Sequence, residues 1–88
     1  MEFEWDEAKS EKNLRTHGIA FDEVAARISG EGFIDSFPNP SPNPNYLGQA
    51  VIRFLSKDGR EWVAVVEPRG KTFRIITAQQ RRKYRSKK

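Results

Sequence analysis

Two kinds of hydrophobic periodicity run along this 88-residue chain, and they divide it into a helical N-terminal part and a strand-rich C-terminal part. At the N-terminus, Phe3 and Trp5 alternate with Glu2 and Glu4. A period of two is typical of a strand with one face buried, so this segment predicts a short first strand.

A first helix is predicted from Glu7 to His17, because signals for both ends are present. Asp6 has the short oxygen acceptor that caps a helix N-terminus, and Gly18 can adopt the left-handed conformation that ends a helix. The amphipathic pattern of this helix is weak, since Ala8 and Leu14 are its clearly apolar residues.

A second helix is predicted more strongly, because four apolar residues fall at helical spacing and define one face. These residues are Phe21, Val24, Ala25 and Ile28. Ala20 stands where a hydroxyl cap is usual, and Gly30 and Gly32 end the helix. Phe33 and Ile34 could begin a short strand.

The remainder of the chain predicts an extended loop followed by three strands. Residues 38–48 contain four prolines within seven positions, which forbids a helix or a central strand, and loops of this length are often functional. Asp58-Gly59 and Pro68-Arg69-Gly70 mark turns between apolar, β-branched runs. The three strands are predicted over residues 49–55, 61–67 and 72–78.

These elements predict one α+β domain over residues 1–88. An N-terminal strand and two helices precede an antiparallel sheet of three to four strands, and the first strand is expected to pair with one sheet edge. Both helices are expected on one face of the sheet.

Charge is distributed unevenly along the chain. Residues 1–44 hold four basic and nine acidic side chains, whereas residues 45–88 hold twelve basic and three acidic ones. The basic C-terminal half suggests a polyanionic partner, of which nucleic acid is the first candidate. Such a partner is expected to bind one face of the molecule. The basic segment 79–88, with Arg81, Arg82 and Lys83, is the strongest candidate for contacts with such a partner, although it could also be a solubilising tail.

The composition argues against a metal site, a cofactor site and a membrane segment. The chain has no cysteine and one histidine, so we expect neither a metal site nor a cofactor. The lack of cysteine fits a reducing compartment, and no stretch approaches the apolar length of a membrane span or has the form of a signal peptide. We therefore expect a cytoplasmic protein without membrane contact.

The N-terminal block also carries a family pattern, formed by Trp5-Asp6, Lys9, Asn13, His17-Gly18 and Phe21. It resembles the signature W-D-x-x-K-x-x-x-N-x-x-K-H-G of the BrnT-type toxins of type II toxin–antitoxin systems. The run Arg74 to Ala78 is similar to R-I-I-S-A of the same family. The resemblance implies a RelE-like fold, a metal-independent ribonuclease that inhibits translation, and a neighbouring antitoxin as partner.

The chain departs from that pattern at several positions, which suggests a divergent branch of these toxins. Thr16 replaces the usual lysine, and the family's arginine at the start of the second sheet strand has no clear counterpart near Ala50 and Val51. The C-terminal helix is shortened to Gln79–Tyr84 and lacks the usual glutamate. The fold is therefore expected to carry over better than the catalytic residues.

Candidate site residues follow from the chemistry of metal-free RNA cleavage, which needs a proton-transferring group and cations that stabilise charge on the phosphate. The catalytic candidates are His17, Arg60, Arg74 and Tyr84. The RNA-binding candidates are Lys9, Lys12, Arg53, Arg81, Arg82 and Lys83, and Tyr84 is also a candidate for base stacking.

Other interpretations stay open at this point. His17 could simply bond the last helix carbonyls, Arg74 could be a solvated strand residue, and Arg60 an exposed turn residue. Trp5 and Trp62 are assigned to the core. The protein could instead be an RNA-binding module without turnover, or a protein-interaction domain whose surface is bound by an antitoxin.

Overall fold

The computed structural model describes residues 2–40 and 48–81 of the chain. Most of the proline-rich segment and of the basic C-terminal segment therefore lie outside the described residues. The same holds for three candidate site residues, namely Arg82, Lys83 and Tyr84.

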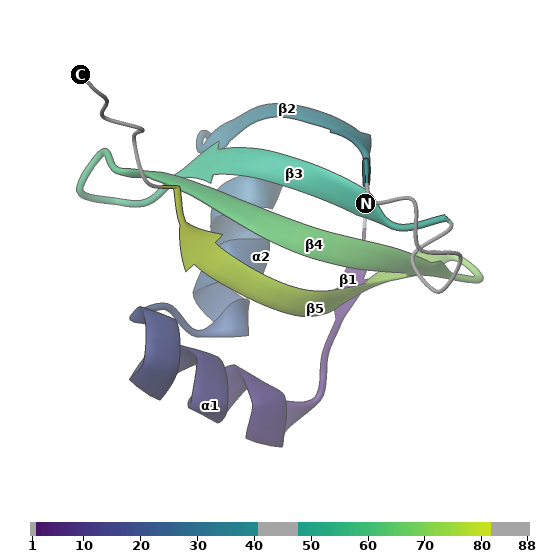
Figure 1. Cartoon of the computed structure of the whole chain (residues 1–88), viewed down its shortest axis with the longest axis horizontal. Coiled ribbons are helices and arrows are strands. Elements are labelled where there is room, and N and C mark those ends of the chain that lie inside the picture. The colour runs from purple at the N-terminus through teal and green to yellow at the C-terminus, as the bar shows by residue number, and fades with distance from the viewer. Residues whose placement is uncertain (1, 41–47, 82–88) are drawn as a thin grey trace.

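The described residues form two helices and five strands in the order β-α-α-β-β-β-β (Figure 1). The helices are α1 (Glu7–His17) and α2 (Phe21–Ser29). The strands are β1 (Glu2–Glu4), β2 (Phe33–Pro38), β3 (Ala50–Leu55), β4 (Glu61–Arg69) and β5 (Thr72–Gln80).

All five strands belong to one sheet in the order β1-β5-β4-β3-β2. Strands β2 to β5 form an antiparallel meander, and β1 adds to the free edge of β5 in parallel, with Phe3 opposite Phe73. The α+β class, the order of elements and the edge position of the first strand are confirmed. The sheet is larger than expected and mixed, because β2 is a full strand and β1 runs parallel to its neighbour.

Strand boundaries differ from the sequence prediction at three places. Pro38 belongs to β2 rather than to the loop, which is possible because β2 is an edge strand and loses no ladder bond on its outer side. The strand predicted over residues 61–67 continues through Pro68 to Arg69 in β4. Pro68 lies beyond Val66, the last residue of β4 that pairs with β3. Gln79 and Gln80 continue β5 and do not begin a helix.

The ends of α1 agree with the predicted signals. The Asp6 carboxylate accepts hydrogen bonds from the backbone N–H groups of Ala8 and Lys9, at 2.8 and 3.2 Å. At the other end, Gly18 is left-handed with φ of 96°, and its N–H donates to the carbonyls of Asn13 and Leu14. His17 is therefore held as the last residue of the helix by backbone bonds alone.

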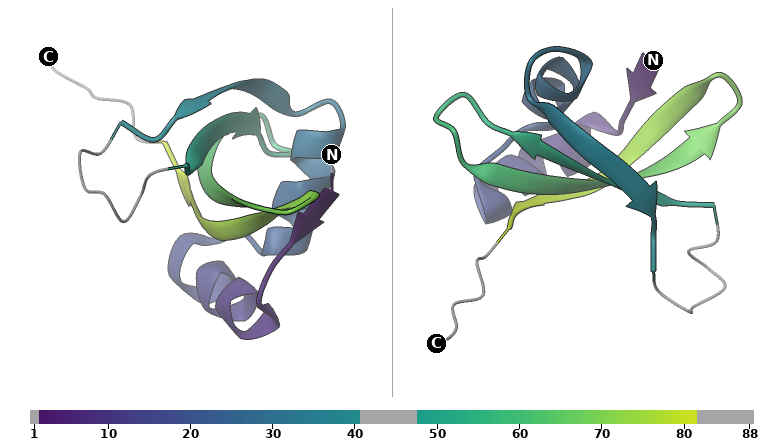
Figure 2. Two further views of the ribbon diagram at one scale, coloured as in Figure 1. Left: turned by 90° about the vertical axis from the view of Figure 1, so that its right-hand side faces the viewer. Right: turned by 90° about the horizontal axis from the view of Figure 1, so that it is seen from above.

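The hydrophobic core lies between α2 and one face of the sheet (Figures 1 and 2). The predicted face of α2 is confirmed, since Phe21, Val24 and Ile28 are buried and Ala25 packs against the core. The sheet contributes Ile52, Phe54, Trp62, Ala64, Val66, Ile75 and Ala78. Trp5 packs against this cluster as well, so both tryptophans have the structural position expected of them.

Helix α1 attaches to the rest of the domain through polar side chains. Its buried residues are Ser10 and Asn13, while Leu14 is 50% exposed. The Ser10 hydroxyl accepts a hydrogen bond of 2.8 Å from the N–H of Phe21, the first residue of α2. A side chain of α1 thus caps α2, which explains how α2 begins without a capping side chain at Ala20.

Candidate functional site

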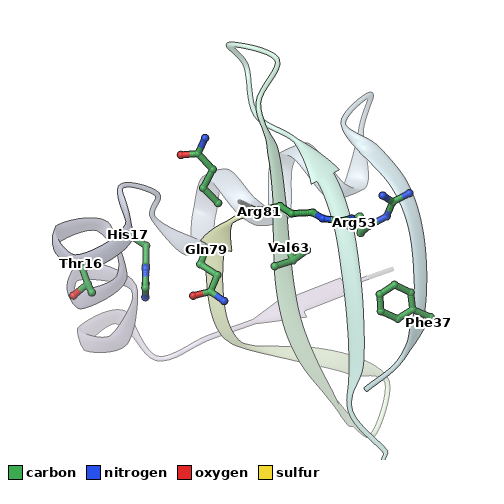
Figure 3. Close-up of a pocket in the computed structure, with 8 residues that line it drawn as sticks. Thr16, His17, Phe37, Arg53, Val63, Gln79 and Arg81 are labelled. Atoms are coloured by element: carbon green, nitrogen blue, oxygen red, sulfur yellow. The ribbon is translucent and has the colours of Figure 1, made fainter. Parts of the chain in front are cut away.

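An open groove of about 740 Å³ crosses the face of the sheet opposite the core (Figure 3). The cross-strand pairs Arg53 with Val63 and Val63 with Gln79 form its floor, and the end of α1 forms one wall. The lining residues are Thr16, His17, Phe37, Arg53, Val63, Gln79, Gln80 and Arg81.

His17 projects from the end of α1 beside Gln79 of β5 (Figure 3). The Gly18 N–H donates to the carbonyls of Asn13 and Leu14, so the helix ends through a backbone cap that does not use the imidazole. Among residues 2–40 and 48–81, the ring makes no hydrogen bond and no ion pair. A neutral imidazole has one donor and one acceptor nitrogen, which leaves His17 able to exchange a proton with a molecule in the groove.

A row of alternating charges lies across the other part of the groove. The Arg53 guanidinium donates to both oxygens of Asp35, at 2.8 and 3.0 Å, and to Glu61 Oε2 at 3.0 Å. Arg81 donates to the same Glu61 oxygen at 2.9 Å. The bidentate hydrogen bond from Arg53 holds the pKa of Asp35 below its ordinary value, and the same bond raises the pKa of Arg53.

This row fixes two guanidinium groups in place and also compensates their charge. Arg53 and Arg81 are balanced by Asp35 and Glu61, and all four side chains are partly exposed. Partly exposed ion pairs of this kind contribute little to stability. A phosphate entering the groove therefore has two preoriented arginines available, but it must compete with the carboxylates already there.

A second hollow, of about 250 Å³, adjoins the groove at His17. It is lined by Lys9, Lys12 and Asn13 on α1 and by Ile76 and Thr77 on β5, and it shares Thr16 and His17 with the groove. The structure thus brings His17, Arg53, Arg81, Lys9 and Lys12 to one continuous surface.

Two sequence candidates lie elsewhere. Arg74 is bound at 3.1 Å to Glu4 across the β1–β5 pair, and Gln79 lies five positions further along β5, roughly 16 Å away. The hydrogen bonds from Thr72 and Arg74 lower the pKa of Glu4. Arg60 is exposed in the β3–β4 turn and pairs with Asp58 at 3.3 Å. Neither arginine lines the groove.

Sequence reasoning missed Phe37, which lines the groove, and the two carboxylates, Asp35 and Glu61, that pair with the arginines of the groove. Asp35 lies directly opposite Arg53 on β2, and Glu61 is its diagonal neighbour on β4, 18 and 8 positions away in the chain. Only the strand register brings these residues together, and no local sequence motif predicts that register. The one available signal is the short strand predicted at Phe33 and Ile34, which would carry Asp35 and Phe37 if extended.

No metal cluster or membrane helix accompanies this surface in the part of the chain that the structure describes. Over residues 2–40 and 48–81, His, Asp and Glu side chains do not gather in groups of three that could hold a metal ion. Neither α1 nor α2 is long and apolar enough to cross a membrane.

Fold and groove together define a small α+β protein with an exposed histidine and paired arginines on an uncovered sheet face. The sequence of residues 5–84 matches the family described as ribonuclease toxin, BrnT, of type II toxin–antitoxin systems. The chain belongs to this BrnT family, as its N-terminal pattern predicted. A partner antitoxin is therefore implied.

A solved structure supports the fold. The crystal structure of the Brucella abortus ribonuclease toxin BrnT, at 1.1 Å resolution, superposes with a TM-score of 0.69 and 18% sequence identity. The match covers 94% of this chain and 99% of the other. Among curated protein sequences, none is a significant match.

Proposed function

We propose that this protein is the toxin of a type II toxin–antitoxin pair and that it cleaves RNA in the groove between α1 and the sheet, without a metal ion. The observation that carries the proposal is the unengaged His17 imidazole on the same surface as the Arg53 and Arg81 guanidinium groups. Family membership supports ribonuclease chemistry, and the groove offers the residue types that such chemistry needs.

The proposed reaction starts with attack of the ribose 2′-oxygen on the adjacent phosphorus. A P–O bond to the 2′-oxygen forms and the P–O bond to the 5′-oxygen breaks, giving a 2′,3′-cyclic phosphate and a 5′-hydroxyl. One proton leaves the 2′-hydroxyl and one is taken up by the 5′-oxygen. His17 serves one of these two proton transfers, a role worth typically 10²–10⁴-fold in rate.

Arg53 and Arg81 are proposed to stabilise the negative charge that develops on the phosphate oxygens. Their present partners, Asp35 and Glu61, hold the guanidinium groups in fixed directions, which favours electrostatic stabilisation without reorganisation. Lys9 and Lys12, on the adjoining hollow, would guide the RNA backbone to His17. Cleavage of messenger RNA in this way would inhibit translation.

The experiment uses purified protein and a single-stranded RNA in the presence of EDTA. Cleavage that survives EDTA, leaves cyclic phosphate ends and falls at least tenfold in Arg53→Ala supports the proposal. Arg60→Ala is the matched control, because it removes an ion-paired arginine outside the groove. Salt-dependent RNA binding without products would instead favour an RNA-binding module.

The antitoxin is proposed to cover the same groove and to exclude RNA from it. Opposite potentials steer such an encounter, so association should slow markedly between 50 and 300 mM salt, as the screening length falls from about 14 Å to under 6 Å. Stopped-flow association rates test this. A rate that barely changes, with a complex that still binds RNA, would place the antitoxin on another surface.

A further inference from the structure

Phe37 is a large aromatic side chain that the fold leaves in the groove rather than in the core. The residue is 42% exposed and lines the groove, at the end away from His17 (Figure 3). Its cross-strand partner is Val51, and the next groove-side neighbours are Asp35 on its own strand and Arg53 on β3.

A β-bulge in β2 places Phe33 and Phe37 on opposite faces of the sheet. The register is continuous from Pro38 to Asp35, and then shifts by one residue between Asp35 and Phe33. Because of this shift, Phe33 pairs with the buried Phe54 and lies on the core side, beside Phe3 and Ile28. Without the bulge, two phenylalanines four positions apart would share one face.

The two phenylalanines therefore have different surroundings at similar exposure. Phe33 is 47% exposed and lines a hollow on the core side together with Phe3 and Ile28. Phe37 has charged groups beside it and an apolar strip, Val51 and Val63, across the neighbouring strands. An exposed ring on a strand, next to arginines, is the arrangement on which proteins stack unpaired bases.

We propose that Phe37 is a stacking platform for a nucleobase of single-stranded RNA, with the adjoining phosphate held by Arg53. This inference rests on the proposed function of the groove. The diagonal separation of Phe37 and Arg53 across an antiparallel pair is about 7–8 Å, so a base on the ring brings its phosphate within reach of the guanidinium.

The platform binds a nucleotide that flanks the cleaved bond. Three inter-strand steps separate β2 from β5, which is roughly 14 Å, and His17 lies beyond β5. Phe37 is therefore a binding residue and takes no part in the chemistry. Its loss should raise KM with kcat unchanged, and should do so for substrates long enough to span the groove but not for a dinucleotide.

Stacking also predicts a distinctive salt dependence. Base–aromatic stacking involves no counterion release, whereas each phosphate contact contributes roughly −0.7 to the log–log salt slope on single strands. Phe37→Ala should weaken binding of a single-stranded oligonucleotide by roughly 5- to 150-fold, as expected for one stacked base, with the slope unchanged. Arg53→Ala should instead make the slope shallower.

The test measures binding of an uncleavable 2′-O-methyl oligonucleotide that contains 2-aminopurine, whose fluorescence is quenched on stacking. Wild type and Phe37→Tyr should quench the probe and bind alike, and Phe37→Ala should lose quenching and affinity. Phe33→Ala is the matched control and should bind as wild type does. All variants are first compared by thermal melting.

The outcomes separate this inference from the proposed function. Equal binding by wild type and Phe37→Ala, with RNA cleavage intact, would overturn the stacking platform and leave the ribonuclease in place. Equal reductions of affinity in Phe37→Ala and Phe33→Ala would also overturn it. Quenching that depends on Phe37, in a protein that cleaves no RNA, would support the platform while contradicting the ribonuclease proposal.

Discussion

The Asn13 side chain of α1 pairs with the backbone of Ala78 in β5, 65 positions away, as a further strand would. Its amide nitrogen donates to the Ala78 carbonyl at 2.9 Å, and its carbonyl oxygen accepts from the Ala78 N–H at 3.3 Å. The same nitrogen donates to the Ile19 carbonyl at 2.9 Å. Asn13 thus anchors α1, which carries His17, to β5, which carries Gln79.

Replacing Asn13 by alanine should therefore destabilise the domain and misplace His17. The backbone groups of Ala78 and Ile19 would be left buried without partners, and each such group costs about 1–3 kcal/mol. Urea unfolding of Asn13→Ala measures the change in stability. The control is Lys12→Ala, whose side chain is exposed on the same helix, and equal stability of the two variants would show that Asn13 does not anchor α1.

The core face of α2 can be tested at Val24, which is fully buried. Val24→Asp places an unpaired carboxylate in the core and should cost several kcal/mol. A small domain has about 5–10 kcal/mol of stability, so this variant should unfold near room temperature. Ala26→Asp, on the exposed face of the same helix, should melt within a few degrees of wild type. Circular dichroism melting curves compare the three proteins.

The Asp35–Arg53 pair predicts a defined contribution to acid stability. The pKa of Asp35 is lower in the folded protein than in the unfolded chain, because Arg53 donates two hydrogen bonds to the carboxylate. The stabilisation is therefore complete above the ordinary aspartate pKa of 3.8 and disappears as the pH falls through the lower, folded value. It does not change between pH 6 and 8.

Melting temperatures from pH 6 down to pH 2 test this contribution. The Asp35→Asn variant should lose less stability over the acid range than wild type does, because it has no carboxylate to protonate at this site. Glu31→Gln, an exposed acid next to β2, serves as the control. Parallel acid curves for wild type and Asp35→Asn would mean that the pair contributes nothing in solution.

The basic C-terminal segment can be separated from the groove by truncation after Arg81. This removes five basic residues and keeps the arginine that pairs with Glu61. If the segment binds RNA, the log–log salt slope of binding should become shallower by roughly 0.7 for each phosphate that the segment neutralises. An unchanged slope would assign phosphate binding to Arg53, Lys9 and Lys12 on the described surface.

Local signals in the sequence predicted the elements that local chemistry determines. The Asp6 cap, the Gly18 terminus and the apolar face of α2 all agree with the structure, because each depends on residues a few positions apart. The Asp58-Gly59 turn lies between β3 and β4 as expected. The family pattern likewise identified the protein class from its N-terminal block.

Features that depend on register could not be predicted in the same way. Apolar periodicity gave no reason to expect that α1 is fastened by Ser10 and Asn13, since their partners lie in other elements. The bulge in β2 that places Phe33 and Phe37 on opposite faces of the sheet is visible only once β2 and β3 are paired. The pairing of Arg53 with Asp35 and Glu61 also depends on the register of neighbouring strands. Because of this pairing, the positive charge of Arg53 is compensated by carboxylates.

The proposed role of His17 is proton transfer during RNA cleavage, and the direct measurement is single-turnover cleavage by His17→Gln in EDTA. The cleavage rate should fall by about 10²- to 10⁴-fold, with RNA affinity and melting temperature unchanged. Arg15→Gln, in the same helical turn, should retain the wild-type rate. Cleavage by His17→Gln within a few-fold of wild type, under conditions where the Arg15 variant is also active, would show that His17 does not transfer a proton in the reaction.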